Sequence, residues 1–296
     1  MLHEVFQIGQ NPNTTLTTYL SPSMGLLEKK PLIIVCPGGG FLDCSPNEGE
    51  CVALHFVRAG YHAAVLIYSN KHTAPDKAAM PQSLFDMADA LCLIRAHSDE
   101  WGVDPDKIII SGFSAGAQLS ALYGNVWNTP LLDGHGTAIQ RKPNAVVLGY
   151  APLDDKAVQP KKKESIDMQS VLSNRKNNVK LQALLEMANT ALYGHYPPSN
   201  EEQRAVCPIY HINAETPPTF LWTTFADVIL SPVQSLHYAE ALYQQGIPCE
   251  LHIFDKGEHG ISLADRTSAK KAKGIDFHTA HWADLAVEWL DRLFEL

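Results

Sequence analysis

The sequence contains few of the features that mark membrane, secreted or repeat proteins. It has no internal repeat, no low-complexity tract and no apolar run long enough to span a bilayer. Residues 1–5 carry an acid where a signal peptide has basic residues, so we expect no signal peptide and a cytoplasmic location. No C-x-x-C pair occurs, and several cysteines lie inside apolar runs, which favours free, buried thiols over disulfides (Cys36, Cys44, Cys51, Cys92, Cys207 and Cys249).

Charge is also scarce, and positive charge most of all. Charged residues make up 19% of the chain, and 23 basic residues against 32 acidic ones give a net charge of -9. This balance argues against nucleic acid or an anionic membrane surface as a partner. The hydrophobic content of 45% indicates a globular protein with a sizeable core, and 296 residues suit one large α/β domain over residues 1–296.

Apolar runs and helical patterns alternate along the chain. Strands are expected at 32–36, 61–68, 107–111, 145–150, 219–224 and 249–254, after two short strands within residues 1–20. Helices are expected at 81–97, 231–245 and 278–294, after the serine at 114, and after a capping box at 45–48. Such alternation implies parallel pairing through right-handed crossovers. The predicted fold class is α/β, with a mostly parallel central sheet and helices on both faces.

The segment from about residue 154 to 218 departs from this alternation. It holds a lysine run at 161–163, an amphipathic helical pattern through Leu181, Leu184, Leu185, Ala188 and Leu192, and a second capping box at 199–202. The segment has too few core residues for a separate domain, so we interpret it as an insertion over the sheet edge. The lysine run is expected to be a solvated loop.

The central motif is Gly-Phe-Ser-Ala-Gly at residues 112–116, between a β-branched strand pattern and a helical one. A sharp turn would expose the Ser114 hydroxyl, and Gly112 and Gly116 would let strand and helix pass closely. The helix start would aim the Ala115 N–H at a developing oxyanion. The motif alone also fits an ordinary turn serine, so its interpretation depends on partner residues downstream.

Two residues downstream fit the roles of acid and base. Where a serine on such a turn is a nucleophile, an acid and then a histidine follow it, each after a strand. Asp227 follows the strand predicted at 219–224, and His259 lies between glycines after the strand predicted at 249–254. These residues supply the base that a hydroxyl needs for nucleophilic attack, and the group that orients that base.

Other candidates for these roles fit less well. His252 lies within a predicted strand and is expected to pack, and Asp255 follows the wrong strand for the acid. His278 and His281 are three residues apart on a predicted helix, a spacing that can hold a metal ion, but no third ligand is evident. We therefore predict no metal site and no cofactor.

A glycine run follows the first buried strand. Pro-Gly-Gly-Gly-Phe at 37–41 would bend freely and expose backbone N–H groups, although a plain loop fits it as well. Together the motifs resemble the α/β-hydrolase esterases of the hormone-sensitive-lipase and acetyl-xylan-esterase-like group. The resemblance covers most of the chain, from about Pro31 to the final helix. It depends on residues 37–41, 48–50, 101–108, 112–116, 217–221, Asp227 and 257–260.

The resemblance implies a role for each site residue. Ser114 would be the nucleophile, Asp227 the orienting acid and His259 the base, and the oxyanion N–H groups would come from Gly39, Gly40 and Ala115. Many relatives begin the glycine motif with histidine. Pro37 in that place resembles the branch of acetyl-xylan and small acetyl-ester esterases.

The expected function is that of a serine esterase acting on short-chain esters, with acetyl esters of sugars as the case that the resemblance suggests. The expected partner is a small-molecule ester, and the sequence leaves a homo-oligomer open. A peptidase or an aryl-formamidase could use the same three residues, although a peptidase usually needs a gating domain. A non-catalytic binding protein with this fold would be expected to have lost one of the three.

Overall fold

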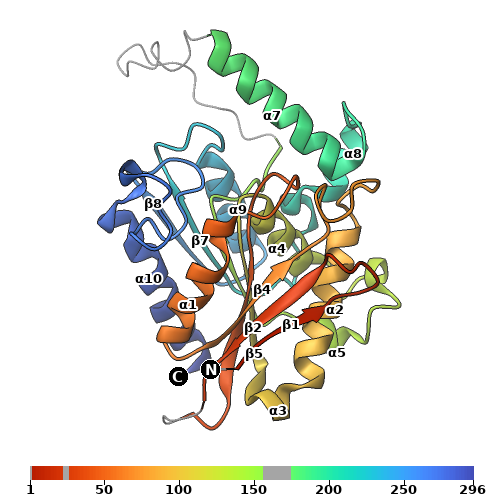
Figure 1. Cartoon of the computed structure of the whole chain (residues 1–296), viewed down its shortest axis with the longest axis vertical. Helices are drawn as coiled ribbons and strands as arrows, with labels where there is room; N and C mark the ends of the chain where they lie inside the picture. Colours follow the sequence, from red (N-terminus) through yellow and green to blue (C-terminus); the bar gives the residue numbers. More distant parts are fainter. Residues whose placement is uncertain (1, 23–26, 156–174) are drawn as a thin grey trace.

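A computed structural model describes residues 2–22, 27–155 and 175–296 of the chain (Figure 1). Within these residues eight strands form one sheet in the order β1-β2-β4-β3-β5-β6-β7-β8. The first pairings, β1 with β2 and β2 with β4, are antiparallel, and the others are parallel. The strands are β1 (Leu2–Gln7), β2 (Thr15–Leu20), β3 (Lys30–Cys36), β4 (His62–Ile67), β5 (Val103–Phe113), β6 (Ala145–Gly149), β7 (Thr219–Thr224) and β8 (Cys249–Phe254).

Helices connect the parallel strands and cover both faces of the sheet. They are α1 (Glu50–Arg58), α2 (Gln82–Ala96), α3 (Ser98–Trp101), α4 (Ala115–Val126), α5 (Ala138–Arg141), α7 (Arg175–Tyr193), α8 (Asn200–Val206), α9 (Val233–Gln244) and α10 (Phe277–Phe294). In Figure 1, α1 and α10 lie together on one side of the sheet, while α2 lies on the other. The mostly parallel sheet with helices on both faces confirms the predicted fold class.

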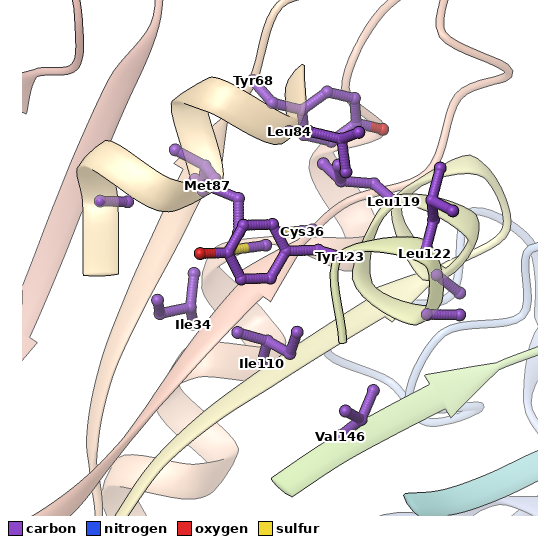
Figure 2. Close-up of a cluster of buried hydrophobic side chains, with 14 of the residues drawn as sticks. Ile34, Cys36, Tyr68, Leu84, Met87, Ile110, Leu119, Leu122, Tyr123 and Val146 are labelled. Atoms are coloured by element: carbon purple, nitrogen blue, oxygen red, sulfur yellow. The ribbon is translucent and has the colours of Figure 1, made fainter. Parts of the chain in front are cut away.

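The core is split by the sheet into two layers. Ile34 and Ile110 point to the layer beneath α2 and α4 (Figure 2), whereas their neighbours Ile33 and Ile109 belong to the layer beneath α1 and α10. All four side chains are fully buried. Both faces of these strands are therefore covered, which explains why their sequences are continuous apolar runs instead of alternating ones.

Strand β5 is longer than its apolar run predicts. It begins at Val103, which pairs with Lys30, but the next partners along the ladder are Leu32 and Ile108. The register shift leaves Pro105 in a bulge, where its missing N–H breaks no ladder hydrogen bond. From the sequence, residues 101–105 were expected only to end the preceding helix, with the strand beginning at 107, and the bulge explains why the strand includes Pro105.

Within the described part of the segment from 154 to 218, helix α7 lies against the loops that follow β3 and β4. Helix α7 accepts hydrogen bonds at its Ala191 and Leu192 carbonyls from the N–H groups of Ala79 and Met80. Ala191 and Leu192 are buried, but Leu184 and Leu185 are each 46% exposed, so the expected amphipathic burial holds only at the end of the helix. The lysine run at 161–163 and the side chain of Leu181 lie outside the described residues.

The two predicted capping boxes differ in outcome. At 199–202 the Ser199 and Glu202 side chains bond each other's backbone N–H, as predicted. At 45–48 the prediction was wrong, because Ser45 makes no side-chain cap and its hydroxyl donates to Asn47. The Glu48 side chain turns inward and is 2% exposed.

The structure also describes the cysteines and the helix lengths. All six thiols are free; Cys36, Cys44 and Cys207 are buried, whereas Cys92 and Cys249, expected to be buried, are only partly so.

Among the described residues no helix is long and apolar enough to cross a membrane, and no cluster of three or more His, Cys, Asp or Glu side chains could hold a metal ion.

Candidate active site

Ser114 occupies a strained turn between the central strand β5 and helix α4. Its φ of 50° and ψ of -118° lie outside the favoured regions for a residue with a side chain. The turn is tight because a Cβ on Gly112 would lie 2.2 Å from the Gly116 carbonyl oxygen, and one on Gly116 would lie 2.1 Å from that of Cys36. Both glycines are therefore required for strand and helix to approach, as the motif predicted.

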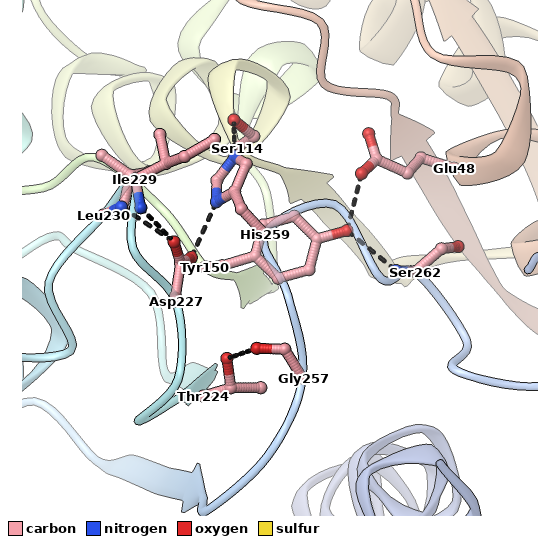
Figure 3. A network of polar contacts seen from close by, with 10 residues as sticks. All are labelled: Glu48, Ser114, Tyr150, Thr224, Asp227, Ile229, Leu230, Gly257, His259 and Ser262. Carbon is pink, nitrogen blue, oxygen red and sulfur yellow. Dashed lines mark hydrogen bonds and ion pairs between the residues drawn. The ribbon is translucent and has the colours of Figure 1, made fainter. Parts of the chain in front are cut away.

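The three side chains predicted to act together form one chain of hydrogen bonds (Figure 3). Ser114 Oγ lies 2.8 Å from His259 Nε2, and His259 Nδ1 lies 2.7 Å from Asp227 Oδ2. The Asp227 side chain is fully buried and that of His259 is 13% exposed. Asp227 follows β7 and His259 follows β8, so the parallel sheet brings loops distant in sequence to one edge.

The Asp227 carboxylate is held in place by its own loop. Its Oδ1 accepts the N–H groups of Ile229 at 2.8 Å and Leu230 at 2.9 Å, which leaves Oδ2 free to face the imidazole. The hydroxyl of Thr224 donates to the Gly257 carbonyl at 2.7 Å and ties the acid loop to the histidine loop. With Nδ1–H donating to Asp227, Nε2 is left as the acceptor facing Ser114.

The glycine run comes close to Ser114, since a Cβ on Gly38 would lie 2.9 Å from that of Ser114. Gly39 and Gly40 have φ values of 131° and 64°, and Ala115 is the first residue of α4. Within the described part of the chain, no group accepts a hydrogen bond from these three N–H groups. The N–H of Gly38 is occupied, because it donates to Glu48 Oε2 at 2.8 Å. Gly39 and Gly40 are therefore the two glycines of the run with N–H groups available to a ligand.

The rival residues lie elsewhere. His252 lies within β8, where Nε2 contacts Glu250 Oε1 at 2.9 Å and the ring packs against Phe220. Asp255 is exposed and follows β8 instead of β7. His281 Nδ1 lies 3.2 Å from the His278 carbonyl, on the exposed side of α10.

Two residues of this region have no role in the sequence-based interpretation. The Glu48 carboxyl accepts the hydroxyl of Tyr150 at 2.6 Å, and the Tyr150 ring lies edge-on to the His259 imidazole with centroids 5.0 Å apart. Tyr150 also has a positive φ of 35°, which is unusual for a side chain of this size. In the sequence Glu48 belongs to the predicted capping box and to the motif at 48–50 on which the family resemblance depends, and neither predicted these contacts.

Comparison with known proteins identifies the family. The family model BD-FAE matches residues 19–242. The chain is 28% identical over 244 residues to an endo-1,4-beta-xylanase B of Butyrivibrio fibrisolvens, a match that covers 80% of this chain and 33% of that protein. The chain spans between a third and about half of the length of the first curated relatives that it matches, with shares of 33%, 53% and 54%.

Solved structures match over nearly the whole chain. The carboxylesterase Cest-2923 from Lactobacillus plantarum has a TM-score of 0.79 and 25% identity, covering 99% of this chain and 98% of that one. The acetyl ester-xyloside bifunctional hydrolase from Caldicellulosiruptor lactoaceticus has a TM-score of 0.75 and 26% identity, covering 98% of this chain and 96% of that one. These matches agree with the resemblance inferred from the motifs. The chain belongs to the BD-FAE family and has the α/β-hydrolase fold.

Proposed function

We propose that the protein is a carboxylic ester hydrolase in which Ser114 is the nucleophile, His259 the general base and Asp227 the group that orients it. The observation that carries this proposal is the hydrogen-bonded chain from Asp227 through His259 to Ser114. A hydroxyl is a weak nucleophile at neutral pH, and it becomes effective when a base within hydrogen-bond reach takes its proton.

The reaction has two halves. The Ser114 hydroxyl attacks the ester carbonyl while its proton passes to His259 Nε2, and the same proton then leaves with the alcohol as the acyl-enzyme forms. Water next attacks the acyl-enzyme, giving one proton to His259, and Ser114 takes that proton back as the acid departs. Throughout, Asp227 holds the imidazole by Nδ1–H and stabilises the imidazolium. No cofactor is needed for either half.

The negative charge on the carbonyl oxygen would be stabilised by the N–H groups of Gly39, Gly40 and Ala115. These N–H groups have no acceptor within the described chain, which supports this assignment. An N–H that already donates a hydrogen bond within the protein would gain little by donating to the substrate instead. Ala115 adds the positive end of α4, whose first residue it is.

The substrate class we propose is short-chain esters, with acetyl groups on sugars as the favoured case. The position of helix α7 favours a substrate with a small acyl group. A Cβ on Gly40 would lie only 3.3 Å from that of Ala188, so the helix covers the glycine loop there. The sugar is supported by the names of two similar proteins, an endo-1,4-beta-xylanase and an acetyl ester-xyloside hydrolase.

The test is a series of p-nitrophenyl esters from acetyl to octanoyl, followed by acetate release from acetylated xylo-oligosaccharides. We expect kcat/KM to be highest for acetyl or propionyl esters. A higher value for octanoyl esters would contradict the acyl preference, and turnover of peptides or N-formyl arylamines in place of esters would assign a different hydrolase activity to the same three residues.

Two variants test the mechanism with a matched control. Ser114→Ala should lose on the order of a million-fold in kcat, and His259→Ala nearly as much, because the two residues act as a unit. His252→Ala removes the same side chain from β8, outside the site, and should retain most of the activity. A folded His259→Ala that stays active beside an inactive His252→Ala would show that the base is misassigned.

A further inference from the structure

Glu48 is a buried carboxyl group with no partner of opposite charge. It ends a short 3-10 turn (Pro46–Glu48) ahead of α1, and its side chain is 2% exposed. No lysine or arginine of the described residues lies within ion-pair distance of it. Isolated charges are rarely buried because of the desolvation cost, so the position calls for an explanation.

The hydrogen bonds around Glu48 favour its ionised form. Oε2 accepts the Gly38 N–H and Oε1 accepts the Tyr150 hydroxyl, so both oxygens act as acceptors. The Tyr150 oxygen in turn accepts the N–H of Ser262 at 3.1 Å, which directs the phenol proton toward Glu48. Two donors directed at the carboxyl oxygens stabilise the carboxylate relative to the carboxylic acid.

These contacts join the two loops that the proposed reaction uses. Through Gly38, Glu48 holds the glycine run whose next two N–H groups have no acceptor among the described residues. Through Tyr150 and Ser262, it holds the loop that carries His259 (Figure 3). Neighbouring Asn47 adds a bond from its amide to the Gly260 carbonyl at 3.3 Å.

The contacts and the missing counter-ion point to one role, which rests on the proposed function. We propose that Glu48, with Tyr150, is a positioning residue that fixes the Gly38–Gly40 loop for the oxyanion and whose negative charge stabilises the imidazolium form of His259. The imidazolium exists only while the reaction proceeds, so the charge gains its partner in the transition state and not in the resting protein. Interactions that strengthen in the transition state raise kcat and leave KM little changed.

The electrostatic surroundings act on the Glu48 carboxyl in both directions. Burial raises its pKa, and the hydrogen bonds from Tyr150 and Gly38 and the nearby His259 offset only part of the rise. The charged and titratable groups that interact electrostatically with the Glu48 carboxyl come from several elements and are Tyr150, His259, Lys270, Cys44 and Tyr68. The His259 imidazole interacts with the Asp227 carboxylate.

The test compares Glu48→Gln with Asp86→Asn, which makes the same change at another buried carboxyl. Asp86 is 1% exposed and accepts the N–H of Ser69 at 2.8 Å from within α2, on the far side of the sheet from α1. We expect kcat of Glu48→Gln to fall about 10- to 100-fold with KM within about threefold of wild type, and Asp86→Asn to keep kcat.

The pH profile separates this role from simple support of the fold. Without the carboxylate, protonation of His259 becomes less favourable, so the acidic limb of kcat/KM should move to lower pH in Glu48→Gln. Unchanged kcat, or a loss of kcat with the limb unmoved in a folded variant, would overturn the proposal. Wild type and Ser114→Ala are measured in the same assay, and failure of the proposed function would appear there first, as an inactive wild type or an active Ser114→Ala.

A second variant keeps the test valid if Glu48→Gln does not fold. Tyr150→Phe retains the ring against His259 but removes the hydroxyl that donates to Glu48. The carboxylate then has one donor fewer and takes up a proton more readily, so the fall of kcat on acidification should begin at higher pH than in wild type. A folded Tyr150→Phe with the wild-type profile would overturn the proposal.

Discussion

The substitution Asp227→Asn would change one atom at the centre of the site, and the structure specifies how the new side chain must sit. Oδ1 of Asp227 accepts two N–H groups, from Ile229 and Leu230. An amide nitrogen cannot take that place, because it would face two donors. The oxygen of the asparagine must therefore occupy the Oδ1 position, and its NH₂ group must face His259 Nδ1.

An NH₂ group at that place reverses the direction of the hydrogen bond. His259 Nδ1 becomes an acceptor, so the imidazole proton moves to Nε2, which lies 2.8 Å from the Ser114 hydroxyl. A protonated Nε2 cannot accept the hydroxyl proton, and the base is lost although every heavy atom stays in place. The expected loss in kcat is about ten-thousand-fold, or about 5 kcal/mol of transition-state stabilisation, with KM nearly unchanged.

The assay is steady-state hydrolysis of p-nitrophenyl acetate, with thermal unfolding to show that the variant is folded. Asp255→Asn is the matched control, since it makes the same change at an exposed carboxyl that follows β8. It should leave kcat unchanged. If folded Asp227→Asn keeps kcat within about tenfold of wild type, the tautomer argument is refuted and Asp227 is not the orienting acid.

Three further predictions concern stability and reactivity. Burial lowers the pKa of His62 from 6.5 to about 4, so between these pH values the unfolded chain binds a proton that the folded chain does not. Acidification from about pH 6.5 to 4 should therefore remove up to about 3 kcal/mol of stability, which urea titrations of wild type and His62→Gln would measure. Gly116→Ala should lose about 3 kcal/mol in the same assay, because its Cβ would lie 2.1 Å from the Cys36 carbonyl oxygen. In the native protein an alkylating agent should modify the partly buried Cys51, Cys92 and Cys249 before the buried thiols, as peptide mapping by mass spectrometry would show.

Much of the fold could be predicted from the sequence because its signals are local. Strands β7 and β8 begin and end at the predicted residues, since both stretches are bounded by turn residues. The extension of β5 past Pro105 could not be predicted, because it depends on a bulge opposite Lys30 on another strand. The exposure of Leu184 and Leu185 was missed for a similar reason: periodicity gives the apolar face of a helix but not whether anything covers it.

The candidate site could be predicted where it depends only on the order of its residues along the chain. A serine on a strand-to-helix turn, an acid after β7 and a histidine after β8 must meet at the carboxyl edge of a parallel sheet, and the structure brings them within hydrogen-bond distance. The family resemblance assigned the oxyanion N–H groups to Gly39 and Gly40, because the run of three glycines at 38–40 does not itself distinguish among them. The structure adds that Glu48 occupies the Gly38 N–H, while those of Gly39 and Gly40 have no acceptor among the described residues.

Glu48 illustrates why a local motif can predict the wrong contact for a residue. Ser45, Pro46 and Glu48 satisfy the spacing of a capping box, and in an isolated helix the glutamate would turn back to the backbone N–H of the serine. In the folded chain the Ser45 N–H donates instead to the Gly38 carbonyl, and the Gly38 N–H donates to Glu48. The cap is thus replaced by contacts with the loop that follows β3 and with Tyr150, which follows β6 and lies more than a hundred residues away in the sequence. A buried carboxylate without a cation costs stability. In the proposed reaction a cation would form at His259, which would account for the presence of Glu48 between the two loops of the candidate site.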